Sequence, residues 1–111
     1  MKTINRTVIT IKGKKPYVDW ANSFDDGGPK ISKNDLHTTA YLIPDTYDEF
    51  NYENFLKKNF KTIFDSELES WMTDPRVWPR NRTYKDFKRW FYIQISDLAF
   101  DLAKDDLITE E

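Results

Sequence analysis

Residues 52–72 read YENFLKKNFKTIFDSELESWM and carry the clearest periodic pattern in the chain. Its apolar side chains recur at spacings of three and four residues, the period of an α-helix that buries one side. They are Tyr52, Phe55, Leu56, Phe60, Ile63, Phe64, Leu68, Trp71 and Met72. Asn51 is a suitable N-cap, and Asp74-Pro75 a suitable stop. The pattern predicts a helix of about six turns whose apolar stripe needs a partner surface.

Two candidate strands and a short helix precede this stretch. Residues 6–12 are rich in β-branched side chains, and Gly13 ends the run. Residues 37–43 form a second β-rich run, which Pro44 stops because proline has no N–H to donate to a strand ladder. Residues 16–24 open on a proline that suits a first helical turn. One face of this short helix carries Tyr17, Trp20 and Phe24.

The chain after the long helix predicts a connector, a second short helix and a third strand. Residues 75–81 form the connector, which holds two prolines and a tryptophan. Thr83 with Asp86 three residues later is typical of a helix start. Residues 91–100 fit both a helical and a strand period, and we interpret them as a strand because Tyr-Ile-Gln-Ile favours β structure. Near Ser96 the alternation of inward-facing and outward-facing side chains along this strand changes, and this change predicts a bulge.

These elements define an α+β fold: a three-stranded antiparallel or mixed sheet with one long and two short helices packed on one face. We expect residues 1–103 to form a single domain, and residues 104–111 to be a frayed acidic tail. The predicted core is Val8, Ile9, Ile11, Trp20, Tyr41, Ile43, Phe55, Leu56, Ile63, Phe64, Leu68, Trp71, Phe87, Trp90, Phe91, Ile93 and Ile95.

Composition excludes several classes of function. The 111 residues include no Cys, 1 His and 3 Gly, so the sequence holds neither a four-ligand zinc site nor a glycine-rich phosphate fingerprint. The longest run without a formal charge is residues 36–44, far short of a membrane span, and the apolar run near the N-terminus is too short for a secretory signal. We expect a cytoplasmic protein with no membrane segment, no metal and no cofactor.

Several short motifs succeed one another over nearly the whole chain. They are Val8-Ile9-Thr10-Ile11-Lys12, Pro16-Tyr17-Val18-Asp19-Trp20, Ala40-Tyr41-Leu42-Ile43-Pro44, Ile63-Phe64, Glu67-Leu68-Glu69 with Trp71, Trp78-Pro79 with Arg82, and Phe87 with Trp90-Phe91. This succession resembles a family of small bacterial proteins of unknown function. The resemblance implies a compact cytosolic α+β protein, and because the family has no assigned activity it carries over no catalytic or binding residue.

The sign of the charge changes in blocks along the chain, although the net charge is only −2. Residues 76–89 hold six bases and one acid, whereas residues 97–111 hold six acids and one base. Such blocks compensate one another across a folded surface, or they meet a charged partner.

The connector carries the candidate binding residues. Trp78 stands between two prolines that stiffen the loop, and tryptophan and arginine are the residue types most enriched at the energetic centres of interfaces. This composition favours a small non-catalytic protein-interaction or regulatory module, acting as a monomer or a weak homodimer. Its contact residues would be Arg76, Trp78, Arg80 and Arg82. In the competing interpretation Trp78 closes the core, and the arginines pair with acids of the long helix.

Two other functions stay open. Bases and aromatics alternate along residues 76–90, as in surfaces that bind single-stranded nucleic acid, although the acidic blocks would repel a polyanion. A hydrolase could use His37 or a pair of carboxylates on the long helix, although lysines interspersed with those acids indicate a solvated face. The acids are Glu49, Glu53, Asp65, Glu67 and Glu69. Asp25-Asp26-Gly27-Gly28 lacks the spacing of a calcium loop and predicts a solvated turn.

Overall fold

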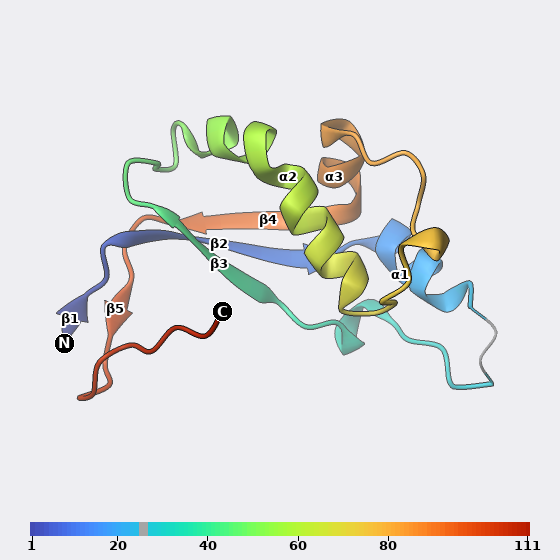
Figure 1. Ribbon diagram of the computed structural model, residues 1–111, viewed down its shortest axis with the longest axis horizontal. Coiled ribbons are helices and arrows are strands. Elements are labelled where there is room, and N and C mark those ends of the chain that lie inside the picture. The colour runs from blue at the N-terminus through green and yellow to red at the C-terminus, as the bar shows by residue number, and fades with distance from the viewer. Residues whose placement is uncertain (25–26) are drawn as a thin grey trace.

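A computed structural model describes residues 1–24 and 27–111, so Asp25 and Asp26 of the predicted turn lie outside the described residues. Figure 1 shows a sheet with helices above it and a small two-stranded arm at one end. The elements in chain order are β1 (Lys2–Thr3), β2 (Arg6–Gly13), α1 (Lys15–Asn22), the 3₁₀ helix η1 (Lys33–Asp35), β3 (Thr39–Pro44), α2 (Tyr52–Glu69), the 3₁₀ helix η2 (Pro75–Val77), α3 (Tyr84–Trp90), β4 (Phe91–Ser96) and β5 (Phe100–Asp101).

The main sheet has the order β3-β2-β4 and is antiparallel throughout, as the α+β prediction allowed. Burial alternates strictly along β2, because successive side chains of a strand point to opposite faces. Ile9 and Ile11 point into the core, whereas Val8 lies opposite Leu42 and Ser96 on the outer face. The prediction that Val8 belongs to the core was therefore wrong, because a run of β-branched residues hides the two-residue period.

The helices α2 and α3 cover one face of this sheet, and α1 lies beyond the end of β2, at the end of the sheet away from the arm (Figure 1). Phe64 lies at the centre of the core, with its ring centroid 5.6 Å from that of Trp90 and 5.2 Å from that of Phe91. Tyr17 joins the core although the sequence did not single it out as buried. The core cluster is Ile9, Ile11, Tyr17, Ile43, Leu56, Ile63, Phe64, Leu68, Phe87, Trp90 and Phe91.

The long helix ends earlier than its apolar stripe predicts. It stops at Glu69, and Trp71 is therefore off the helix and 40% exposed rather than in the core. The indole N–H of Trp71 donates to the carbonyl oxygen of Ala21, 3.2 Å away, so the ring links the end of α2 to α1. The helix begins at Tyr52, with Asn51 at the N-cap position as predicted. The Asn51 side chain, however, makes no capping hydrogen bond to the helix.

The third predicted strand is two strands in different sheets. β4 ends at Ser96, where the Ser96 hydroxyl donates to the carbonyl oxygen of Leu98, and β5 then pairs with β1 as a separate arm. The phase change near Ser96 marks the point where the chain leaves the main sheet rather than a bulge within it. Figure 1 shows this arm projecting from the end of the sheet opposite α1.

Candidate functional site

The connector between α2 and α3 folds back onto the core. Trp78 is half-buried, packs against the core cluster and donates its indole N–H to the carbonyl oxygen of Met72, 2.8 Å away. Trp20 reaches the same segment from α1 and donates to the carbonyl oxygen of Val77 at 3.1 Å. Trp78 thus has a structural role, as the competing interpretation of the sequence expected.

Arg82 fastens the connector to α2. Its guanidinium lies 5.7 Å from the centre of the Trp78 ring and donates to the carbonyl oxygen of Pro79 at 2.7 Å. Its Nε lies 3.3 Å from Oδ1 of Asp65, within ion-pair range, yet this buried oxygen accepts no hydrogen bond. The pair is therefore a coulombic contact: Nε and Oδ1 are close enough for an ion pair, but they are not aligned for a hydrogen bond.

The other two predicted arginines have different surroundings. Arg76 pairs with Asp74 at 2.9 Å, and this bond lowers the pKa of Asp74 and raises the pKa of Arg76. Arg80 is exposed and forms no ion pair or hydrogen bond with any residue in ranges 1–24 and 27–111. The four residues therefore share a segment, but only Arg80 has a free charge.

An open groove of about 620 Å³ lies between the middle of α2 and the segment that leads into α3. Lys61 lines it from α2, and its ammonium forms no ion pair with the residues that the structure describes. Rings of Phe60 and Tyr84, with centroids 5.5 Å apart, form part of the wall. We call this the basic groove; it is lined by Phe60, Lys61, Arg80, Asn81, Arg82, Thr83 and Tyr84.

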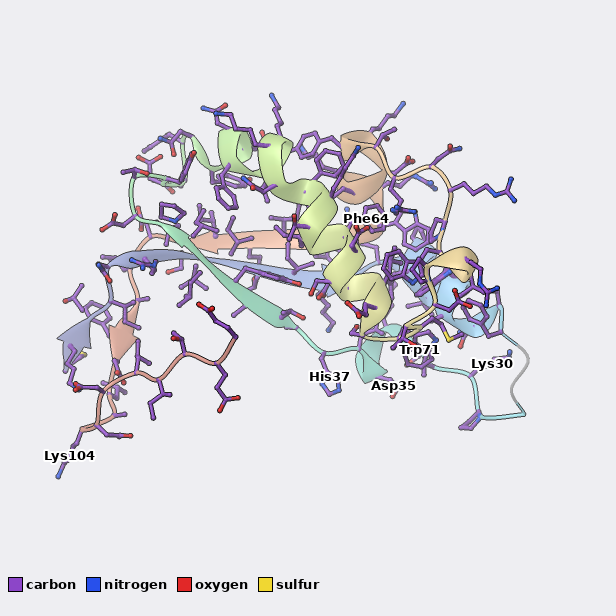
Figure 2. The ribbon with its side chains drawn as sticks, viewed as in Figure 1. Lys30, Asp35, His37, Phe64, Trp71 and Lys104 are labelled. Atoms are coloured by element: carbon purple, nitrogen blue, oxygen red, sulfur yellow. The ribbon has the colours of Figure 1, made fainter. Side chains whose placement is uncertain are left out.

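A second, more enclosed cavity of about 330 Å³ lies under the C-terminal end of α2. We call it the Glu67 cavity, because Glu67 is a buried carboxylate within it, 8% exposed. The cavity is lined by Gly13, Tyr17, Asp35, Leu36, His37, Thr39, Glu67, Ser70, Trp71 and Phe91. Figure 2 shows Asp35, His37 and Trp71 gathered below the end of α2.

Hydroxyl groups from β3 hold the Glu67 carboxylate. Tyr41 donates to Oε2 at 2.8 Å, and Thr39 lies 3.0 and 3.1 Å from the two oxygens. Burial raises the pKa of Glu67, while these hydrogen bonds act in the opposite direction. Burial also raises the pKa of Tyr41, and that of Tyr17, whose hydroxyl donates to the Glu67 carbonyl oxygen at 2.7 Å.

Sequence reasoning placed Glu67 on a solvated face, and this was wrong. Glu67 follows Ile63 by four residues and Phe64 by three, so it falls within the apolar stripe, and that spacing was the available signal. The partners Tyr41 and Thr39 could not be found this way, because they reach Glu67 only through the pairing of β3 beside β2.

The other carboxylates of α2 do not gather with Glu67. Glu53 accepts from Lys88 at 2.7 Å and from Tyr84 at 2.8 Å, and these two hydrogen bonds lower the pKa of Glu53. Asp65 faces Arg82, as described above. His37, the other candidate for hydrolysis, does lie in the Glu67 cavity. Among the described residues, no group of three His, Cys, Asp or Glu side chains could hold a metal ion.

Comparisons with protein-family models, with curated proteins and with solved structures find no match to this chain. No helix in the described part of the chain is long and apolar enough to cross a membrane.

Proposed function

We propose that this chain is a small non-catalytic protein-interaction module that binds an acidic segment of a partner protein in the basic groove. In this proposal it acts in the cytoplasm, as a monomer or a weak homodimer. The observation that carries the proposal is the free charge of Lys61 and Arg80, which line the groove from two different elements and have no acidic partner among the described residues.

The surroundings of the groove support an acidic ligand. Bases outnumber acids on the middle of α2, the connector and α3, and several of those acids are already paired. A field of one sign over a concave surface raises the local concentration of the opposite charge and speeds encounter. The bases are Lys57, Lys58, Lys61, Arg76, Arg80, Arg82, Lys85, Lys88 and Arg89, of which Arg76, Arg82, Lys88 and Arg89 are themselves paired with acids.

Protein fits this surface better than single-stranded nucleic acid. Binding of single strands uses exposed aromatic faces on which bases stack. In residues 76–90 the rings pack internally: Trp78 lies under Arg82, Tyr84 stacks on Phe87, and Trp90 is buried. The segment thus offers several cations but a single ring of its own in the groove wall, that of Tyr84, which suits the carboxylates of a peptide better than a row of stacked bases.

The test compares a charge reversal in the groove with a matched reversal elsewhere. Lys61→Glu with Arg80→Glu should weaken binding of a fluorescent peptide rich in Asp, Glu and Leu by more than about tenfold, measured by anisotropy. Added salt should weaken the wild-type interaction, because exposed charges are screened. Arg82 is left in place since it fastens the connector.

The control is Lys30→Glu with Lys104→Glu, which changes the net charge equally at sites that Figure 2 shows away from the groove. Both variants should keep the wild-type circular dichroism and melting midpoint. Equal loss in both variants would reduce the effect to net charge and contradict the proposal. Tighter binding of an oligothymidylate than of the peptide would instead assign the groove to nucleic acid.

A further inference from the structure

The Glu67 cavity is electronegative. Two carboxylates, Glu67 and Asp35, line it, and the described residues that line it include no lysine or arginine. It also lies at the C-terminal end of α2, where the helix dipole and the last carbonyl groups favour positive charge. One Asp35 oxygen caps η1 by accepting from Ser32, and the other has no hydrogen-bond partner among residues 1–24 and 27–111. The site is therefore suited to a cation and is separate from the basic groove.

Its walls are aromatic as well as acidic. Tyr17, Trp71 and Phe91 line the cavity together with the two carboxylates. Aromatic faces attract organic cations through the negative charge of the ring face, and a nearby carboxylate adds a direct ion pair. This combination is typical of sites for ammonium groups. The volume of about 330 Å³ matches the lower range of small-ligand pockets and is too large for a single bare ion.

We propose that the Glu67 cavity binds a primary ammonium group, with Glu67 as its ion-pair partner at the base and Asp35 at the rim. The ammonium belongs either to a small free amine or to a lysine side chain of a protein. Both are protonated at neutral pH. This inference does not rest on the proposed function, because it uses other residues, at the C-terminal end of α2 rather than at its middle.

The hydrogen bonds of Glu67 favour binding over catalysis. Thr39 and Tyr41 hold the carboxylate in one orientation, and an ionised carboxylate has about four acceptor positions, so capacity remains for an incoming N–H donor. A fixed carboxylate of this kind is preorganised for an ion pair, which reduces the entropy lost on binding. Thr39 and Tyr41 are thus positioning residues.

The experiment titrates 1,4-diaminobutane and, separately, N-acetyl-lysine-methylamide into the full chain and follows NMR signals. The expected result is a saturable shift of the Trp71 indole and Thr39 amide signals at or below about 10 mM ligand. Tighter binding of the diamine would identify a free amine as the ligand, and tighter binding of the lysine analogue a side chain. No saturable shift with either compound overturns the proposal.

Glu67→Gln keeps the size of the side chain and should weaken amine binding by more than about tenfold. Glu69→Gln is the matched control, because this neighbouring carboxylate is exposed on the same helix, and it should leave binding unchanged. If Glu67→Gln does not fold, Asp35→Asn at the exposed rim takes its place and should weaken binding in the same direction. Equal affinity in wild type and folded variant, or tighter binding of acetate than of the amines, contradicts the proposal.

Discussion

Three tryptophans link separate elements of the molecule in the same way. The ring of each packs against neighbouring elements, and its indole N–H donates a hydrogen bond to a backbone carbonyl oxygen. Trp20 donates to Val77, Trp71 to Ala21 and Trp78 to Met72. All three side chains are partly shielded from water, and an indole N–H that is shielded and unpaired costs up to about 1–3 kcal/mol. These bonds join α1, the end of α2 and the connector into one assembly, and they fix the wall that Trp71 gives to the Glu67 cavity.

Glu67 and Glu53 are expected to influence stability with opposite dependence on pH. Burial raises the pKa of Glu67 above its ordinary value of 4.5, so Glu67 binds a proton more readily in the folded protein than in the unfolded chain. Its stabilising contribution is present below pH 4.5 and is lost as the pH rises through the folded pKa. In denaturant titrations across this range, Glu67→Gln should therefore gain stability relative to wild type as the pH rises.

Glu53 supplies the comparison on the same helix. The hydrogen bond from Lys88, and then that from Tyr84, lowers the pKa of Glu53 below 4.5, so its contribution is present above that pH and is lost as the pH falls. Relative to wild type, Glu53→Gln should be less stable above pH 4.5, and this difference in unfolding free energy should shrink as the pH falls. Over the same fall in pH, Glu67→Gln should lose the stability that it gains over wild type at higher pH. A pH trend of the same sign in both variants would contradict the assigned surroundings.

At the scale of elements, α2 stabilises the fold by covering the sheet. Phe64 is fully buried and contacts Phe87, Trp90 and Phe91, so its truncation leaves a cavity in the middle of the aromatic cluster. Phe64→Ala should cost about 3–5 kcal/mol of the free energy of unfolding, measured in urea.

Phe50 is the matched control, because it lies just before α2 and its side chain is 88% exposed. Phe50→Ala should change the unfolding free energy by less than about 0.5 kcal/mol. If Phe64→Ala were as mild as Phe50→Ala, α2 would not pack on the sheet through its stripe.

The elements also show where the sequence was informative. Periodicity located α2, and the capping box of Thr83 and Asp86 located α3, since both signals are local. The split after Ser96 was missed because β5 is defined by its pairing with β1, which lies at the other end of the chain. The same holds for the Glu67 cavity, whose residues come from six separate segments. The residues of the connector were chosen for composition, which did not distinguish the exposed Arg80 from Arg82; the competing interpretation did expect an arginine to pair with an acid of the long helix, as Arg82 does with Asp65.

At the scale of the whole molecule, the main sheet and the arm differ in what supports them. β2 is hydrogen-bonded on both sides, and its inward side chains Thr7, Ile9 and Ile11 are almost fully buried. The arm consists of two two-residue strands; Phe100 within it is 48% exposed, and Leu98 and Leu102 beside it are 67% and 78% exposed. A strand pair this short is marginal without a packed face.

Amide hydrogen exchange should therefore divide the chain at Ser96. Amides of β2 should exchange only by global unfolding, with an opening free energy equal to that of the whole molecule, about 5–15 kcal/mol for a small domain. The amides of the β1–β5 arm, including Ile4, which donates to Ala99 at 2.9 Å, should open locally with a free energy near zero. Removing residues 98–111 should leave exchange in β2 unchanged. Equal protection of arm and sheet would place the arm within the cooperative core, because a unit that opens alone cannot share the global free energy of unfolding.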